Sequence, residues 1–210
     1  MDAKQHWEHV YSTKSATEVS WFQREARVSL DLITRAAGPA AAILDAGGGT
    51  STLVDGLLDR GYTGVTVLDI AAAALEAAQA RLGSRAARVR WLAADLLRHP
   101  FARHGLDVWH DRAVFHFLTS AADRQAYVAQ VARAVRPGGH VIVATFAADG
   151  PTKCSGLDVC RYSPGALHAE FGAAFELLGK VFEEHVTPAG HLQRFQYCLC
   201  AVRASASVAA

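Results

Sequence analysis

Residues 42–51 constrain the fold of this chain more than any other segment. They form a short apolar run that ends in the carboxylate of Asp45 and is followed by three consecutive glycines and a pair of hydroxyl residues. About 20 residues further along the chain than the first run, residues 64–70 form a second apolar run, which also ends in an acid, Asp69. A strand, a glycine-rich turn, a helix and an acid-tipped strand are typical of a βαβ nucleotide-binding unit.

Composition limits the class of protein and its partners. The chain has 210 residues, 51% hydrophobic and 20% charged, so we expect one globular domain. Lysine and arginine (21) balance aspartate and glutamate (20), which argues against a nucleic-acid partner and an anionic membrane surface. The start is polar and no run of about 18 apolar residues occurs, so the sequence favours a cytoplasmic protein without a membrane span.

The four cysteines, Cys154, Cys160, Cys198 and Cys200, are expected to be reduced. Cys198 and Cys200 lie two residues apart in an apparent strand and therefore share one face. This spacing does not match the common zinc sites, so we expect buried thiols there and predict no metal site.

Alternating strand and helix signals fill the rest of the chain. An amphipathic pattern predicts a first helix over residues 20–37. We expect strands at 41–45, 65–68, 89–93, 107–109 and 140–146, helices at 51–60, 71–82, 123–135 and 163–171, and strand-like runs at 175–185 and 193–202. The last two runs form a hairpin, which needs no crossover helix. The predicted fold is α/β: a doubly wound, mostly parallel seven-stranded sheet with a C-terminal antiparallel β-hairpin.

Three acids at successive strand ends identify the nucleotide class. A pyrophosphate fingerprint needs a third glycine where this chain has Thr52, and Asp45 would repel a pyrophosphate. The same carboxylate suits a ligand with an ammonium or sulfonium group. Asp69 is placed to accept hydrogen bonds from two ribose hydroxyls, and Asp95 to meet an exocyclic amine. A cationic nucleoside without phosphates fits this set, and S-adenosylmethionine is the common one.

With these acids and the glycine loop, the chain resembles the class I S-adenosylmethionine-dependent methyltransferases over nearly its whole length. The matching motifs lie at residues 44–49, 68–70, 94–96, 106–109 and 135–139, and the terminal hairpin matches the last two strands of the family. The resemblance implies a cofactor-binding set made of Asp45, Gly47, Gly48, Gly49, Asp69, Ile70, Asp95, Leu96, His110 and Trp21. In that family the glycine loop wraps the methionine and ribose, the second acid binds ribose, and the third addresses adenine. Ser51 departs from the pattern, because many members have a third glycine there.

The resemblance also divides the chain. Residues 1–38 become a cover segment with a helix, residues 39–203 the S-adenosylmethionine-binding methyltransferase domain, and residues 204–210 a flexible tail. Trp7, Tyr11, Trp21 and Phe22 resemble the aromatic pattern of the cover helices of small methyltransferases, which close over the adenosyl ligand.

The methyl acceptor is expected to lie after the fourth and fifth strands. His110 follows the fourth strand and could act as a general base, because imidazole titrates near neutral pH. Arg112 could clamp a substrate carboxylate or pair with Asp111, whereas His116 is expected to pack against a helix. The Asn-Pro-Pro-Tyr type of sequence that marks nucleic-acid and protein-amide methylating branches is absent here.

After the fifth strand, residues 149–162 form a loop too long for a simple turn, and we expect it to act as a lid. Cys154 in this lid could bind a soft acceptor or be a plain buried thiol. Tyr162 could anchor an anionic or phenolic group. The candidate catalytic residues are therefore His110, Arg112, Cys154 and Tyr162.

The sequence thus favours a methyltransferase that acts on a small-molecule acceptor, at an N, O, S or metalloid atom. A protein lysine or histidine methyltransferase is the second reading, and a non-catalytic module that binds S-adenosylmethionine is the third. A nicotinamide dehydrogenase is disfavoured by Asp45 and Thr52. The sequence leaves the acceptor atom and the oligomeric state open.

Overall fold

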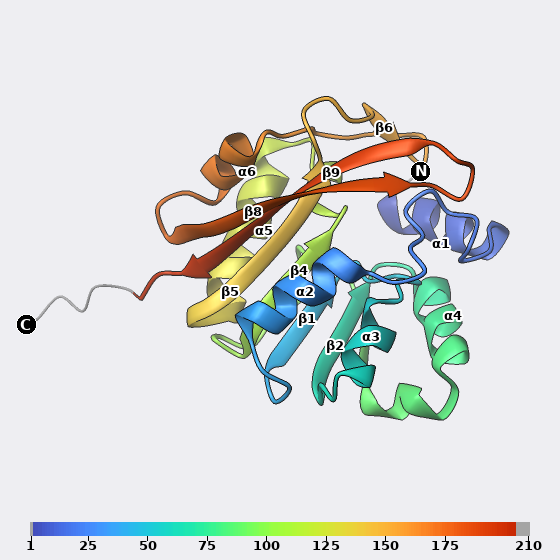
Figure 1. Ribbon diagram of the computed structural model, residues 1–210, viewed down its shortest axis with the longest axis horizontal. Helices are drawn as coiled ribbons and strands as arrows, with labels where there is room; N and C mark the ends of the chain where they lie inside the picture. Colours follow the sequence, from blue (N-terminus) through green and yellow to red (C-terminus); the bar gives the residue numbers. More distant parts are fainter. Residues whose placement is uncertain (1, 205–210) are drawn as a thin grey trace, which may run out of the picture.

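The computed structural model describes residues 2–204, and a seven-stranded sheet forms its centre (Figure 1). Its strands are β1 (Ala42–Ala46), β2 (Gly64–Asp69), β3 (Arg90–Ala93), β4 (Leu106–Arg112), β5 (Val135–Phe146), β8 (Phe175–Val186) and β9 (Leu192–Val202). They lie in the order β3-β2-β1-β4-β5-β9-β8. The strands from β1 to β5 pair in parallel, and β9 is antiparallel to both β5 and β8. The predicted sheet with its terminal hairpin is confirmed.

The direction of winding reverses between β1 and β4. From β1 the chain proceeds outward to β2 and β3, and it then returns to place β4 and β5 on the other side of β1. In such sheets a crevice opens at the carboxyl ends of the strands where the order reverses. The residues at the ends of β1 and β4 therefore border the expected binding site.

Helices cover both faces of the sheet, because its central strands are apolar on both sides. Helices α2 (Arg27–Ala36), α3 (Leu53–Asp59) and α4 (Ala72–Leu82) pack on one face, and α5 (Ala121–Ala134) and α6 (Pro164–Phe171) on the other. Successive residues alternate between the two cores: Ile43 joins the first and Leu44 the second. In Figure 1, α2 crosses in front of the sheet while α5 and α6 lie behind it.

Helix α1 (Ala3–Thr13) lies beside the start of α4, across the carboxyl ends of the strands (Figure 1). The carboxylate of Glu8 accepts hydrogen bonds from the backbone N–H groups of Ala72 and Ala73, at 2.8 and 3.2 Å. These N–H groups have no partner within α4, and a carboxylate suits the positive end of its dipole. This contact holds α1 over the site.

The first helix starts later than predicted. Residues 20–26 are not helical, and α2 begins at Arg27. The carbonyl oxygens of Ser20, Trp21 and Gln23 bond to side chains of His185, Arg112 and Thr52, respectively. Tertiary contacts thus take the acceptors that helical hydrogen bonds would use, and residues 20–26 form a strap of turns and bends.

Three further elements differ from the prediction. Strand β4 runs on to Arg112, because β1 and β5 pair with it from both sides. Strand β5 begins at Val135, with a register shift opposite residues 106–108. The lid contains a small hairpin of β6 (Lys153–Cys154) and β7 (Leu157–Asp158).

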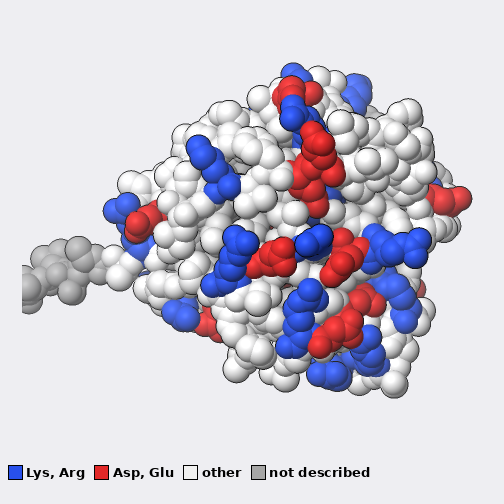
Figure 2. All heavy atoms as spheres, in the orientation of Figure 1, with Lys and Arg blue, Asp and Glu red and all other residues white. Residues whose placement is uncertain are grey.

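The surface and the ends of the chain contribute little to the position of the site. On the face shown in Figure 2, basic and acidic side chains are interleaved over most of the molecule. No helix within residues 2–204 combines the length and apolarity that crossing a membrane requires. Cys198 and Cys200 are buried free thiols, as predicted. The predicted tail falls outside the described residues, apart from residue 204.

Candidate active site

The glycine loop after β1 depends on the absence of side chains. Gly47 and Gly49 have φ angles of +67° and +50°, which L-residues rarely adopt. A Cβ atom on Gly47 would collide with the side chain of Val114, and one on Gly48 would lie 2.5 Å from the Asp45 carboxylate. Side chains at these positions would collide with their neighbours, so the bare glycine backbone forms this border of the site.

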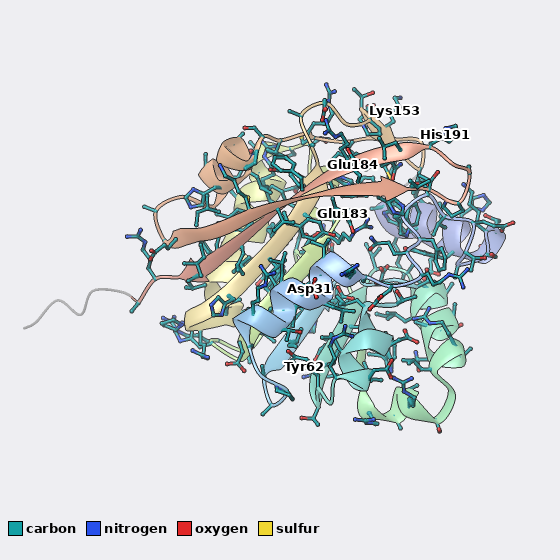
Figure 3. The ribbon with its side chains drawn as sticks, viewed as in Figure 1. Asp31, Tyr62, Lys153, Glu183, Glu184 and His191 are labelled. Carbon is teal, nitrogen blue, oxygen red and sulfur yellow. The ribbon has the colours of Figure 1, made fainter. Side chains whose placement is uncertain are left out.

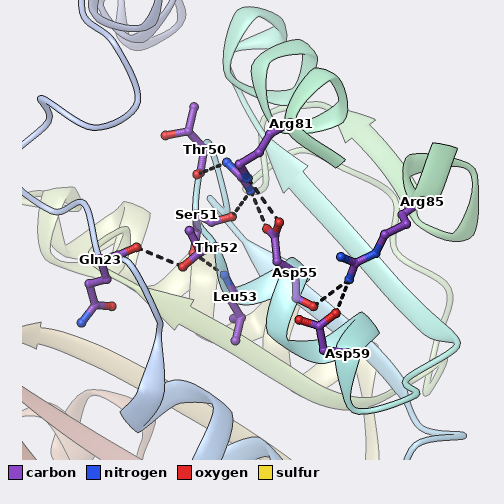
Figure 4. Close-up of polar contacts among 9 residues, drawn as sticks. All are labelled: Gln23, Thr50, Ser51, Thr52, Leu53, Asp55, Asp59, Arg81 and Arg85. Atoms are coloured by element: carbon purple, nitrogen blue, oxygen red, sulfur yellow. Dashed lines mark hydrogen bonds and ion pairs between the residues drawn. The ribbon is translucent and has the colours of Figure 1, made fainter. Parts of the chain in front are cut away.

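Polar contacts fix the exit of this loop (Figure 4). Arg81 of α4 donates to the carbonyl oxygens of Thr50 and Ser51, both at 2.7 Å, and pairs with Asp55. The Ser51 hydroxyl accepts from the backbone N–H of Leu53 at 3.1 Å. Ser51, the departure from the family pattern, thus satisfies a backbone donor at the start of α3.

Asp45 lies at the end of β1 and is buried. Its Oδ1 is 2.8 Å from Nδ1 of His110, and Nε2 of His110 is 2.9 Å from the hydroxyl of Ser29 in α2. The other carboxylate oxygen, Oδ2, is buried and has no hydrogen-bond partner among the described residues. A buried carboxylate oxygen without a partner is costly, so this site calls for a donor from a ligand.

The two other acids follow β2 and β3. Asp69 is buried, and its Oδ1 accepts from the N–H of Ala71 at 2.9 Å. Burial, and to a lesser extent the charge of Asp45, raise the pKa of Asp69 to about 7. Asp95 is more exposed; one oxygen accepts from the N–H of Leu97 and the other lies 3.5 Å from Arg98. The three acids line the same edge of the sheet, as the sequence predicts.

A cavity of about 330 Å³ lies between two of these acids, Asp69 and Asp95, and the covers. Of the predicted site residues, it is lined by Trp21, Gly47, Asp69, Ile70, Asp95, Leu96, Arg112 and Cys154. A smaller hollow of about 40 Å³ shares Trp21, Gly47 and Arg112 with it and also touches Asp45 and Gly48. The predicted residues Gly49, His110 and Tyr162 line neither space.

Aromatic side chains form the roof of the cavity. Trp7 and Tyr11 come from α1, Trp21 from the strap, and Phe117 from the short 3₁₀ turn Phe115–Phe117 after β4. The ring centroid of Trp7 lies 5.8 Å from that of Trp21 and 5.1 Å from that of Phe117, in edge-to-face arrangements. The N-terminal segment and the turn after β4 therefore meet above the site.

Arg112 does not pair with Asp111, contrary to one sequence expectation. Asp111 accepts instead from the Tyr127 hydroxyl and from the N–H groups of Val114 and Phe115, so it holds the turn after β4. Arg112 faces the other side, because side chains alternate along a strand. There it pairs with Glu183 of β8, with Nη2 and Oε2 3.2 Å apart.

The other two catalytic candidates have different surroundings. The Cys154 thiol is buried in β6 at the cavity wall, and burial raises its pKa to about 11, so it stays protonated at neutral pH. Tyr162 is buried on the opposite face of the sheet, with its ring 5.8 Å from that of Phe115. Its hydroxyl has no partner among the described residues, and burial raises its pKa. The structure brings Cys154 to the cavity and leaves Tyr162 away from it.

The comparisons with known proteins agree with this geometry. A methyltransferase domain family model matches residues 43–139, which contain the glycine loop, the three acids and β4. Over residues 43–139 the chain is therefore similar to methyltransferase domains, in agreement with the resemblance seen in its sequence. S-adenosylmethionine is the cofactor that the comparisons indicate. A search of curated proteins found no match.

Solved structures share the methyltransferase fold. A protein from work on the conversion of a disulfide bond into a thioacetal group during echinomycin biosynthesis has a TM-score of 0.77 and 21% identity, over 98% of this chain and 95% of that chain. An S-adenosylmethionine-dependent methyltransferase from Anabaena variabilis has a TM-score of 0.74 and 16% identity, over 97% and 96%. The 1,6-didemethyltoxoflavin-N1-methyltransferase of Burkholderia thailandensis, with its substrate and S-adenosylhomocysteine bound, has a TM-score of 0.67 and 19% identity, over 96% and 84%.

The residues present fit the cofactor of the methyltransferase. The orphaned Oδ2 of Asp45 needs a donor, and the ammonium group of a methionine moiety is one. The backbone at Gly47 leaves no room for a side chain between the loop and Val114. A cavity of about 330 Å³ is within the range of small-molecule sites, roughly 300–1,000 Å³.

Sequence reasoning missed several residues of the methyltransferase site. Ser29 and Glu183 come from α2 and β8, far from the motifs in the chain, and no local pattern marks them. Phe117 and Leu157 also line the cavity. The available signal was the period of two along a strand. It places Glu183 on the same face as Phe175, which the structure shows to be the inward face of β8.

Proposed function

We propose that this methyltransferase transfers the methyl group of S-adenosylmethionine to a small-molecule acceptor at an N, O, S or metalloid atom. The observation that carries the proposal is one cavity beneath the covers. Asp69 and Asp95 line it together with Trp7, Phe117, Cys154 and Leu157. Helix α1 and the lid hairpin cover this cavity, which suits a substrate that can be enclosed entirely.

The cofactor end is assigned as follows. Asp45 accepts from the ammonium group of the methionine moiety, and the backbone of residues 47–49 lies along that moiety. Asp69 accepts from both ribose hydroxyls, and Asp95 from the exocyclic amine of adenine. Ile70 and Leu96 pack beside the adenine, and Leu96 also offers its backbone N–H. In this arrangement the buried carboxylate of Asp69 gains two hydrogen-bond donors. They offset the free-energy cost of burying its charge, which is the same cost that raises its pKa.

His110 is a positioning residue in this proposal. Both of its ring nitrogens are engaged, one by Asp45 and one by Ser29, and its side chain is buried. These contacts fix the orientation of the Asp45 carboxylate. They favour this role over that of a general base, which must reach the proton of the acceptor.

When bound, S-adenosylmethionine supplies a methyl group that its sulfonium has already activated. The remaining task of the protein is to hold the acceptor atom close and collinear and to exclude water. The Tyr11 hydroxyl and the Cys154 thiol face the cavity, and burial raises the pKa of both. Both groups therefore stay protonated and can orient an acceptor by hydrogen bonding without becoming charged.

The Burkholderia relative supports a small acceptor, because that protein was solved with 1,6-didemethyltoxoflavin bound. It shares this fold over most of both chains. The strap and α1 of the present chain supply covers for an enclosed substrate, and the cavity is lined mainly by apolar side chains.

The test is a panel of thiols, metalloids, amines, phenols and carboxylates, with formation of S-adenosylhomocysteine as the readout. Turnover of at least one small compound is expected. Transfer only to polypeptides of a cell extract would identify a protein methyltransferase instead. Tight cofactor binding without turnover of any small or protein acceptor would leave a non-catalytic binding module.

A further inference from the structure

The acceptor end of the cavity has walls of aromatic rings. Trp7, Trp21 and Phe117 contribute rings there, with the centroid of Trp7 5.8 Å from that of Trp21 and 5.1 Å from that of Phe117, and Tyr11 packs against Trp7 and Trp21 on the side of Gly49 and Asp69. Such rings offer large apolar faces and edges at fixed angles, and they are complementary to another flat ring. Leu118 and Leu157 complete the apolar wall.

Arg112 is the one basic residue that lines the cavity within the described part of the chain. Its Nε and Nη2 lie 3.3 and 3.2 Å from Oε2 of Glu183, and both side chains are only 10% exposed. Nη1 donates to the carbonyl oxygen of Trp21, and the guanidinium lies 4.1 Å from the centre of the Phe195 ring. The positive charge of Arg112 is therefore already compensated.

Glu183 is itself held in place. Its Oε1 accepts from Nε2 of Gln23 in the strap at 2.7 Å, and its Oε2 accepts from the Tyr197 hydroxyl at 2.9 Å. Both carboxylate oxygens are thus engaged from separate elements. Glu184, the next residue of β8, is 63% exposed and lies near Arg194 at the surface (Figure 3).

We propose that the acceptor is an uncharged aromatic or heteroaromatic molecule, and that Glu183 sets this specificity by neutralising Arg112. This inference rests on the proposed small-molecule methyl transfer. A carboxylate or phosphate on the acceptor would lose its hydration and find no free cation among the described residues that line the cavity, and it would lie near the negative Glu183 and the carboxylate of the cofactor. A neutral ring loses little hydration and gains contact with the aromatic side chains. The preference for neutral acceptors then comes partly from the unfavourable binding of negatively charged ones.

The first test uses wild-type protein and matched pairs that differ by one carboxylate. Suitable pairs are catechol with 3,4-dihydroxybenzoate, and aniline with 4-aminobenzoate, compared by kcat/KM for methyl transfer at pH 7.5. We expect the neutral member to be preferred by at least about tenfold. Equal use of both members, or preference for the anion, overturns the inference.

The second test asks whether Glu183 carries the preference. Glu183→Gln frees the charge of Arg112, so the neutral-to-anionic ratio should fall about tenfold or invert. The matched control Glu184→Gln changes the adjacent, exposed glutamate and should keep the wild-type ratio. An unchanged ratio in folded Glu183→Gln, or the same change in both variants, removes the role of Glu183.

A reciprocal variant covers the case in which Glu183→Gln fails to fold. Arg112→Gln leaves the negative Glu183 without its partner, so the neutral-to-anionic ratio should rise. No rise contradicts the assignment. If no small compound is methylated while extract polypeptides are, the proposed function itself fails. If small anions are methylated as well as neutral compounds, only the inference fails.

Discussion

The two ends of the cavity are built in different ways. The cofactor end consists of strand tips and their turns: Asp45, the glycine loop, Asp69 and Asp95 all lie in a strand or within three residues of its end. The acceptor end consists of separate covers, namely α1, the strap, the turn after β4 and the lid hairpin. At the cofactor end, each part of the site is formed by residues that are close together in the sequence. At the acceptor end, residues from distant parts of the chain meet.

This difference separates what is general from what is particular to the chain. Strand tips are fixed by the pairing of the sheet, so their acids can be set in the same positions in any chain of this fold. The covers are fixed by individual contacts, such as Glu8 to α4 and Glu183 to Arg112. The methyl donor is therefore determined by the sheet, and the acceptor by the covers.

The largest effect is expected at the cofactor end. Asp69→Ala removes the acceptor for two ribose hydroxyls, each worth about 1.5–3 kcal/mol at most, so the Kd for S-adenosylmethionine should rise at least about tenfold. Isothermal titration calorimetry measures it. The control Asp59→Asn changes a surface acid that pairs with Arg85 and should leave Kd unaltered. Unchanged affinity in folded Asp69→Ala refutes the assignment.

His110 tests whether the two ends act separately. His110→Ala removes the contact that orients Asp45, so the Kd for S-adenosylmethionine should rise about tenfold, while kcat at saturating cofactor changes little. Ser29→Ala leaves the contact between Asp45 and His110 and should have a smaller effect. The sequence alone predicts the opposite pattern, a larger loss of turnover than of binding. Observation of that pattern would restore His110 as a general base.

Cofactor affinity should depend on pH through Asp69. The pKa of Asp69 is about 7 in the free protein, and ribose hydroxyls donate to its ionised form, so affinity should rise several-fold between pH 6 and pH 8. Asp69→Asn should abolish this dependence, which calorimetry at several pH values would reveal. An equally steep dependence in the variant assigns it to another group.

The raised pKa of Asp69 also predicts how the stability of the cofactor-free protein depends on pH. Its pKa is raised above the ordinary value of 3.8, so the folded state holds the proton more tightly than the unfolded state. The stability from this proton is complete at low pH and is lost as pH rises through about 7. Asp69→Asn should therefore melt at a higher temperature than wild type at pH 8, with a smaller difference at pH 5. The reverse order would show that burial does not dominate at Asp69.

The smallest effect is expected at the lid. The Cys154 thiol is buried with a pKa of about 11, so it should react slowly with iodoacetamide at pH 7.5. Cys154→Ser should change the Kd for cofactor by less than about twofold, since the thiol lies away from the three acids. Mass spectrometry and calorimetry measure these two quantities. Rapid alkylation in the folded protein would show that the lid is open.

Sequence reasoning predicted the sheet, its order of elements and the cofactor end, because apolar periodicity and glycine turns act locally. It misplaced the start of α2, because side chains such as His185 capture the carbonyl oxygens of the strap. It gave a substrate carboxylate or Asp111 as the partner of Arg112 and missed Glu183, because Glu183 lies 71 residues further along the chain. The acceptor end depends on such distant pairs, so it became visible only in the folded chain.

One measurement tests the central claim most directly. The methyltransferase is incubated with methyl-labelled S-adenosylmethionine and a whole cell extract, and the products are separated into small molecules and polypeptides. The covered cavity predicts that the label from transfer appears in small molecules. Label in polypeptides alone would contradict it.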